Sequence, residues 1–483
     1  MKSTAQSIAA EPGRTPLAPS VRWALASLSL SMLMPSLDTS IANVGLPTLA
    51  QTFSASFHAV QWIVLAYLLA ITTLIVGAGR LGDIVGHRRL LLIGIVLFTT
   101  ASLLCGIAPT LWLLIAARAA QGVGAAIMIA LTMALVGQTV PAARTGSAMG
   151  LLGTMSAIGT TLGPSLGGLL IAGLGWRVIF LVNIPLGLMN FLLAQRYLPR
   201  DQRKTQSARA RIDVVGTLLL ALTLAAYALA MTIGHGRFGA LNMAWLAAAA
   251  VGAIAFVFAE SKTAAPLLRL PMFRDPTLSA GLAMSALVAT VMMATLVVGP
   301  FYLSRALGLA PALVGLAMSA GPLVAALTGV PAGRIVDRFG AQRMTRCGLI
   351  GMIAGLSALA MLPATVGVAG YLAPLVLVTA NYALFQAANN TAIMTDIGPD
   401  RRGLVSGMLN LSRNLGLITG AAVMGTIFAL ATATVDISSA PPAAIAGGMR
   451  FTYAIAALLI AVALAIATGG RVLAHKAGQA SRG

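Results

Sequence analysis

The chain has 483 residues and a formal net charge of +20, yet 58% of its residues are apolar, only 9% are charged, and its mean hydropathy is +0.93. A soluble domain carries about 25% charged residues, so this composition excludes an ordinary soluble protein and indicates helices that lie mostly in lipid. The charge does not indicate a nucleic-acid partner, because the basic residues stand in short segments between long apolar runs and form no continuous basic face.

The first 22 residues are polar and show no signal-peptide pattern, so we predict a cytoplasmic tail over 1–22. A membrane-spanning helix needs about 20 mostly apolar residues. Fourteen segments meet this length and are predicted to be transmembrane helices: 23–50, 59–79, 90–108, 111–137, 146–172, 177–195, 214–234, 241–260, 277–303, 311–331, 346–363, 369–395, 404–431 and 449–470. The two cysteines, Cys105 and Cys347, lack metal-ligand spacing, and we interpret them as small buried residues.

Lys and Arg in short loops predict the orientation of a membrane protein. An even number of spans puts both termini on one side, and that side holds most of the 31 basic residues. The other side holds only Arg177, Arg237, Arg305 and Arg450. We therefore predict a multi-pass protein of the cell membrane, in a bacterium the cytoplasmic or inner membrane, with both termini cytoplasmic.

Two similar phrases divide the chain. "GRLGDIVGHRR" (79–89) follows the second span, and "GRIVDRFGAQR" (333–343) follows the tenth. Gly159 and Gly163 in the fifth span also recur, with the same spacing, as Gly416 and Gly420 in the thirteenth. The sequence therefore predicts an all-α polytopic membrane protein built from two related six-helix halves, as in transporters whose halves rock around a site near the membrane midplane. The predicted parts are an N-terminal half 23–195, a basic cytoplasmic linker 196–213, two inserted transmembrane helices 214–260, a cytoplasmic loop 261–276, a C-terminal half 277–470 and a cytoplasmic tail 471–483.

Asp38, in "SLDTSIANVGLP" (36–47), is the one acid that we place well inside a span. A charge at lipid depth is costly, so it marks a functional site by default. Proton coupling needs a group that loses and regains a proton as access alternates. We therefore predict that Asp38 carries the proton, pairs with the substrate, or does both in competition. The alternatives are a structural ion pair with a buried arginine, or a position near the outer surface.

Polar residues in other parts of the spans extend this candidate proton- and substrate-binding set. Arg118 opens "RAAQGVGAA" (118–126) in the fourth span; it stays protonated and needs a partner, either a carboxyl whose proton release it tunes or a purely structural one. Gln121 shares the helix face of Arg118. Asn43 stands on the span of Asp38, just before Pro47, which frees a backbone carbonyl and permits a kink.

The twelfth span adds Asn389 and Asn390, which we predict line a polar cavity. The sequence has no phosphate-binding loop of the type G-x-x-x-x-G-K-[ST], so ATP-driven transport is not expected. We expect no cofactor and no metal, with the proton gradient as the energy source. The expected partners are a lipophilic small molecule, protons and the bilayer, with the chain acting as a monomer and binding no nucleic acid.

Glycines crowd the fifth span in "GTTLGPSLGG" (159–168). Small residues allow close helix approach, and a proline bends the helix. We predict a pliable seam against the opposite half, with tight packing alone as the plainer interpretation. The residues concerned are Gly159, Gly163, Pro164, Gly167 and Gly168.

The repeated phrases are predicted to form tight cytoplasmic turns and a latch that holds the halves together when the cytoplasmic side is closed. Gly86 and Gly340 suit a positive φ, and Asp83 and Asp337 can accept hydrogen bonds from helix N-termini or pair with an arginine. A topology signal alone would explain the arginines but not these glycines and acids. The first copy contributes, in addition, Gly79, Arg88 and Arg89.

These motifs resemble the signatures of the major facilitator superfamily, and more narrowly its fourteen-span drug:proton antiporter branch. The phrase at 79–89 is similar to the family's loop 2–3 motif, and the stretches around Asp38, Arg118 and 159–168 are similar to its motifs in spans 1, 4 and 5. The resemblance covers about 22–470. It implies proton-driven export of lipophilic, often cationic compounds. Spans 9–11 lack acids at depth, which favours neutral or monovalent cationic substrates over divalent ones.

The sequence thus predicts a proton-coupled drug exporter that works by alternating access and is not an enzyme. An exporter of one endogenous metabolite, or a symporter on the same fold, stays open as an alternative. An integral-membrane enzyme would need several convergent titratable groups, whereas one acid is deep. A channel is more often symmetric by oligomerisation than by an internal repeat.

Overall fold

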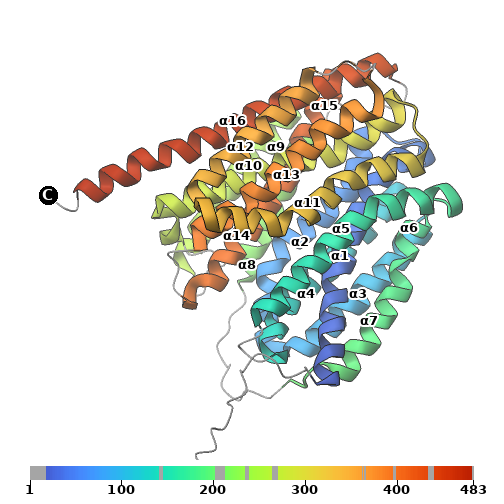
Figure 1. Cartoon of the computed structure of the whole chain (residues 1–483). Helices are drawn as coiled ribbons and strands as arrows, with labels where there is room; N and C mark the ends of the chain where they lie inside the picture. The colour runs from blue at the N-terminus through green and yellow to red at the C-terminus, as the bar shows by residue number, and fades with distance from the viewer. Residues whose placement is uncertain are drawn as a thin grey trace, which may run out of the picture.

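The computed structural model describes residues 18–140, 145–201, 213–233, 239–263, 270–361, 363, 366–394, 399–432 and 440–480, and every regular element in these ranges is helical (Figure 1). The predicted all-α architecture is confirmed. Most of the linker 196–213 and of the N-terminal tail lies outside these ranges, and so do 264–269 of the loop 261–276. The domain boundaries stay predictions, although α16 continues to Ala480, past the predicted end of the last span at 470.

The first half begins with long helices at the first five predicted spans. They are α1 (Pro19–Thr52), α2 (Phe57–Val85), α3 (His87–Ile107), α4 (Leu111–Thr139) and α5 (Thr145–Leu174). The sixth span is two helices, α6 (Val178–Leu181) and α7 (Asn183–Tyr197), where we expected one. Pro185 explains the break, because it has no amide proton for the carbonyl of Leu181 four residues earlier.

The second half repeats this order, with a π-helical turn at each of two places. Its helices are α10 (Pro276–Phe301), α11 (Pro311–Phe339), α12 (Ala341–Met361), α13 (Gly367–Met394), α14 (Pro399–Thr419), α15 (Gly425–Ala431) and α16 (Pro442–Ala480). A 3-10 turn, η2 (Leu270–Arg274), precedes α10, and π-helical turns continue α10 as η3 (Tyr302–Ala306) and join α14 to α15 as η5 (Gly420–Met424). The inserted pair is α8 (Val214–Thr232) and α9 (Ala240–Lys262).

Thirteen helices within the described ranges are long and apolar enough to cross a membrane. α1 lies where the first span is predicted but is less apolar, since serines and other polar residues interrupt it. Ser31, Asp38 and Asn43 are nevertheless buried against other helices. The arrangement is therefore compatible with fourteen spans. The polar residues that make α1 less apolar are the ones that it contributes to the protein interior.

The two halves meet at one end of the molecule. We call the end that carries the turns at Gly86 and Gly340 the basic end, and the other the opposite end. At the opposite end, a Cβ on Gly168 of α5 would lie 2.5 Å from the carbonyl oxygen of Pro311 in α11. Phe57 of α2 packs there against two rings of the second half, with ring centroids 4.8 Å from Phe301 and 5.7 Å from Phe428.

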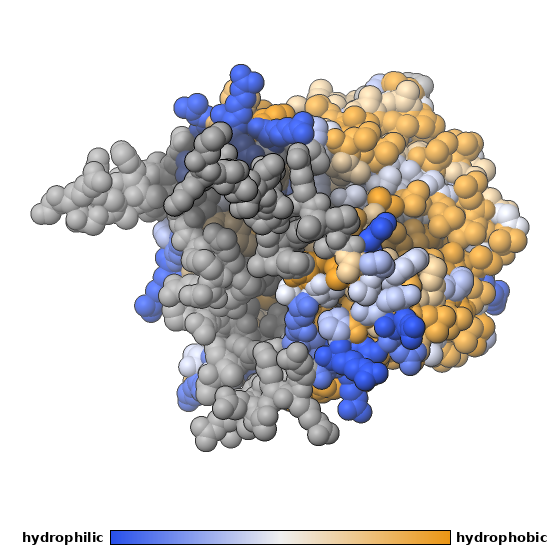
Figure 2. Space-filling view, turned by 60° about the horizontal axis from the view of Figure 1, so that its bottom comes forward, coloured by the Kyte–Doolittle hydropathy of each residue, from blue (hydrophilic) through white to orange (hydrophobic). Residues whose placement is uncertain are grey.

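The basic end is looser. A Cβ added to Gly79, Gly137 or Gly153 of the first half, or to Gly333 or Gly340 of the second, would meet no other described segment within 4 Å. Hydrophilic side chains gather on the face that Figure 2 brings forward, while apolar side chains cover the flank beside it. The described residues therefore hold the halves together at the opposite end, while these glycines at the basic end have open space beside them.

Candidate functional site

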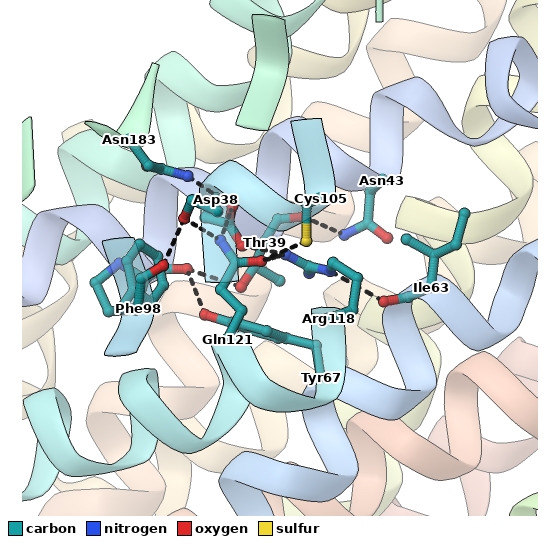
Figure 3. Close-up of polar contacts among 12 residues, drawn as sticks. Asp38, Thr39, Asn43, Ile63, Tyr67, Phe98, Cys105, Arg118, Gln121 and Asn183 are labelled. Atoms are coloured by element: carbon teal, nitrogen blue, oxygen red, sulfur yellow. Dashed lines mark hydrogen bonds and ion pairs between the residues drawn. The ribbon is translucent and has the colours of Figure 1, made fainter. Parts of the chain in front are cut away.

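Asp38 lies in the interior of the first half, on α1, with 1% of its surface exposed. The backbone around it is held locally, since the hydroxyl of Thr39 donates to the carbonyl of Pro35 at 2.8 Å. The side chain of Asp38 points toward α4 and α7 (Figure 3). Of the alternatives for Asp38, the ion pair with a buried arginine is present, and three helices enclose the carboxylate.

Arg118 forms an ion pair with Asp38, through its terminal nitrogen and the carboxylate Oδ2. The guanidinium is fully buried and makes two further contacts with α2. Its Nε donates to the carbonyl of Ile63 at 3.1 Å, and its plane lies 4.1 Å above the ring of Tyr67. A buried charge pair is tolerated when the geometry is good and the remaining donors find acceptors. Here α2 supplies an acceptor and an aromatic face, while the second terminal nitrogen of Arg118 has no hydrogen-bond partner among the described residues.

Gln121 and Asn183 complete the surroundings of the carboxylate. Each donates its amide to Asp38 Oδ1 at 2.8 Å. Gln121 also donates to Ser102 Oγ at 2.8 Å and accepts from Arg118 at 2.6 Å, so both of its amide hydrogens and its oxygen are engaged. A fully engaged amide has one orientation, and Gln121 therefore fixes Asp38 and Arg118 relative to each other.

Asn183 and Ser102 were missed by the sequence analysis. A signal for Asn183 existed in the sequence, because it is a polar residue in an apolar run. The same holds for Asn190, which lies about two turns further along on the same face of the helix. Asn190 is also buried and accepts from Ser27 while donating to Ser31, each at 2.8 Å. Both asparagines of α7 thus face α1, and Asn183 is the first residue of α7 after the break in the sixth span.

Asn43 does not join this network. It is buried, but its amide donates to the carbonyl of Thr39 in its own helix at 3.0 Å. Its side-chain oxygen has no partner among the described residues. The structure therefore places Asn43 near Asp38 on the same helix, without a direct bond to the carboxylate.

Asn389 and Asn390 lie in the second half, apart from Asp38. Asn389 is buried on α13 and donates to the carbonyl of Gly281 in α10 at 3.1 Å. It borders a pocket of about 480 Å³ at the basic end, whose walls include Met284, Ile393 and Arg343. Asn390, the next residue along, is exposed. Of the two asparagines predicted to line a cavity, Asn389 borders this pocket, whereas Asn390 lies on the surface.

The predicted positive φ at both repeated turns is confirmed, with φ +105° at Gly86 and +86° at Gly340. The carboxylate that caps the helix after the first turn was not predicted. It belongs to Asp201, whose oxygens accept from the backbone amides of Arg88 and Arg89 at 3.0 Å each. The side chain of Asp83 lies outside the described part, and that of Asp337 is exposed. Their latch role stays a prediction.

Arg88 contacts its own half rather than the other one. Its guanidinium donates to the carbonyl of Gln195 in α7. In this arrangement the first turn is tied to the end of the sixth span. Gly79, on α2 before the turn, has open space where a side chain would stand.

The glycines of α5 divide between two neighbours. A Cβ on Gly159 would lie 2.6 Å from the carbonyl oxygen of Leu33, and the nearest neighbours of Gly163 and Gly167 are also residues of α1, in the same half. Gly168 faces Pro311 and Gly315 of the other half, and the carbonyl of Pro164 contacts Gly315. The interpretation as tight packing holds for the first three, and the seam with the opposite half is built by Pro164 and Gly168.

Known proteins resemble this chain over most of its length. It is 33% identical to the "Multidrug resistance protein Stp" of Mycobacterium tuberculosis, over 84% of this chain and 75% of that protein. It is 30% identical to the "Riboflavin transporter RibZ" of Clostridioides difficile, over 84% and 88%. Its fold matches an inward-facing, occupied bacterial homologue of the lysosomal transporter Spinster, with a TM-score of 0.69 at 16% identity over 94% and 98% of the two chains.

The family assignment rests on the sequence model that matches the chain. That model covers residues 28–421 and, in a second overlapping match, 303–477. Together these matches cover both halves, the inserted pair and the motifs around Asp38 and Arg118. The protein is therefore a multi-pass membrane transporter, and it belongs to the Major Facilitator Superfamily.

Proposed function

We propose that the chain is a proton-coupled antiporter that exports lipophilic, neutral or monovalent cationic compounds from the cytoplasm by alternating access. The observation that carries this proposal is the enclosed carboxylate of Asp38, paired with Arg118 and bonded by Gln121 and Asn183. An ionisable residue at this depth is expensive, and in membrane transporters such residues serve as proton relays or substrate contacts.

Proton binding at Asp38 requires its bonding partners to rearrange. Its two oxygens accept from three N–H donors, as those of an ionised carboxylate do. A proton on Oδ1 or Oδ2 would displace one donor. If Arg118 is the donor displaced, Ile63, Tyr67 and Gln121 still contact its guanidinium.

Proton exchange also requires movement of the helices. Asp38 and Arg118 have 1% and 0% of their surface exposed, so water does not reach the pair in this arrangement. We propose that rocking of the halves exposes Asp38 to one side of the membrane at a time. The proton gradient then drives the cycle, and the chain's own residues need no resident cofactor for this.

The charge balance of the site supports the proposed substrate class. Arg118 neutralises Asp38, so the pair offers no surplus charge to a divalent cation. A neutral compound, or a monovalent cation that competes with Arg118 or with a proton for Asp38, fits this balance. The relative named a multidrug resistance protein supports drug export as the biological role.

Transport by proteoliposomes under an imposed pH gradient tests the proposal. We expect wild-type protein to move a lipophilic monocationic dye against the proton flux, and Asp38→Asn to abolish gradient-driven movement while it still inserts and folds. Asp275→Asn is the matched control, because Asp275 caps α10 at the basic end, away from the site, and Asn retains that cap. Gradient-driven efflux at the normal rate in Asp38→Asn would refute the role of Asp38.

A single metabolite as substrate is the second candidate, and the similarity to a riboflavin transporter is the observation that favours it. A panel of dyes, antibiotics and riboflavin in the same vesicles separates the two. Movement of several unrelated compounds supports a multidrug exporter, whereas movement of riboflavin alone supports a dedicated one. We further propose that the protein acts as a monomer in a bacterial inner membrane with both termini cytoplasmic.

A further inference from the structure

The C-terminal end of the inserted helix α8 lies at the junction of the two halves. A helix leaves its last four carbonyls without partners in the helix, and in lipid each such group is costly. At α8 the carbonyls of Ala230 and Ile233 both accept from Asn242 of α9, at 2.8 and 2.5 Å. The inserted pair thus satisfies part of its own end, and the carbonyl of Met231 accepts from Thr426 of the second half.

One half binds this end through α2. The indole nitrogen of Trp62 donates to the hydroxyl of Thr232 at 3.0 Å. That hydroxyl in turn donates to the carbonyl of Ala228 at 2.8 Å, so its position is fixed by its own helix. Thr232 is buried, with 6% of its surface exposed.

The other half binds the same end through α15. The hydroxyl of Thr426 lies 2.6 Å from the carbonyl of Met231, the residue before Thr232, and 2.8 Å from the carbonyl of Ala422 in its own segment. It has one hydrogen to donate, and the shorter of the two contacts is the one to Met231. The halves also bond each other directly beside this point, because Gln61, next to Trp62, donates to the carbonyl of Ala421 in η5 at 2.7 Å. Two consecutive residues of α8 therefore hold one half each, where the halves are closed.

We propose that the end of α8 is a latch that holds the halves together at the opposite end. Its two arms are the Trp62–Thr232 and the Thr426–Met231 hydrogen bonds. Because the arms stand in series through α8, loss of either one releases the latch, and each opening of that end in the transport cycle breaks one of them. This assigns a role to the inserted pair, and it rests on the proposed alternating-access cycle.

Distance measurements between two spin labels test the latch without any substrate. Labels at Thr52 of α1 and Ala310 before α11 report on the opposite end, since both are exposed there on different halves. Cys347, which is exposed, is replaced by Ser, and buried Cys105 is kept. Thr426→Val keeps the shape but loses the donor, and we expect the population with the long label distance to rise about fivefold, the effect of one hydrogen bond.

The controls separate a latch from a general loss of packing. Thr426→Ser keeps the donor and should restore the wild-type distribution. Thr432→Val removes a buried hydroxyl at the same end that bonds only within its own segment, to Ala429 at 2.7 Å, and should leave the distribution unchanged. An unshifted Thr426→Val, or an equal shift in Thr432→Val, would overturn the proposal.

A double variant tests the series arrangement directly. Trp62→Phe removes the other arm and should give the same shift as Thr426→Val, and it replaces that variant if Thr426→Val fails to fold. The two substitutions together should shift the distances no more than either alone, because interacting positions are non-additive. Additive shifts would show two independent contacts and no latch. A latch confirmed in a protein that moves no compound in vesicles would count against the proposed function alone.

Discussion

The first half carries an ion pair in its interior, whereas the corresponding place in the second half is apolar. Asp38 meets Arg118 in the first half. At the offset that relates Gly86 to Gly340, the counterpart of Asp38 is Met292. The described interior of the second half has a pair of tyrosine hydroxyls instead, Tyr371 and Tyr453, 3.5 Å apart. The repeat therefore preserves the helical scaffold and the turns, while the buried Asp–Arg ion pair belongs to the first half.

The largest expected effect comes from removing one charge of the pair. Arg118→Met should leave Asp38 buried and uncompensated and lower the free energy of unfolding by about 3–5 kcal/mol. The double variant Asp38→Asn/Arg118→Met should recover most of that loss but no gradient-driven transport. Thermal unfolding in detergent measures the first outcome and vesicle transport the second. A double variant that transports normally would mean that the asymmetry between the halves has no functional role.

A second prediction concerns the amide that the sequence analysis missed. Asn183→Ala should leave Asp38 with one donor fewer and slow gradient-driven transport about tenfold, the equivalent of one lost charge-assisted hydrogen bond of about 1.5 kcal/mol. Asn190→Ala is the matched control, because Asn190 lies on the same helix and bonds Ser27 and Ser31 instead of Asp38. Equal slowing in both variants would assign Asn183 to packing alone.

The repeated turns give a third prediction that compares the halves directly. Gly86→Ala and Gly340→Ala both put a side chain at positive φ, which costs about 1–2 kcal/mol. A Cβ at Gly86 would also collide with the carboxylate of Asp201, whereas one at Gly340 would enter open space. We expect Gly86→Ala to lower the unfolding temperature more than Gly340→Ala. An equal loss would contradict the difference between the two turns.

The smallest effect is expected at Asp201 itself. Asp201→Ala removes the acceptor for the amides of Arg88 and Arg89 and should cost about 1 kcal/mol, as the loss of a helix cap does. Hydrogen exchange should speed up at those two amides and stay unchanged in peptides that cover the second turn around Gly340. Unchanged exchange at Arg88 and Arg89 would show that the cap does not hold in solution.

Hydropathy predicted nearly all of the fold because lipid imposes it locally. Each span is a run of apolar residues long enough to satisfy its own backbone, so composition alone positions the helices. The exceptions follow from single residues. Pro185 divides the sixth span, and the polar residues of α1 lower its apolarity while they build the site. The extension of α16 to Ala480, past the predicted end at 470, has no such local explanation.

The sequence by itself determined the helices, the repeat, the positive φ at Gly86 and Gly340, and the choice of Asp38 and Arg118 as candidates. These depend on residue type, spacing and the cost of charge in lipid, all of which are local properties. Only the tertiary structure decided which residues from distant parts of the sequence contact each other. Asn183 reaches Asp38 across 145 residues, Asp201 caps the helix after the first turn, and α8 bonds both halves, because such contacts depend on how helices pack in space.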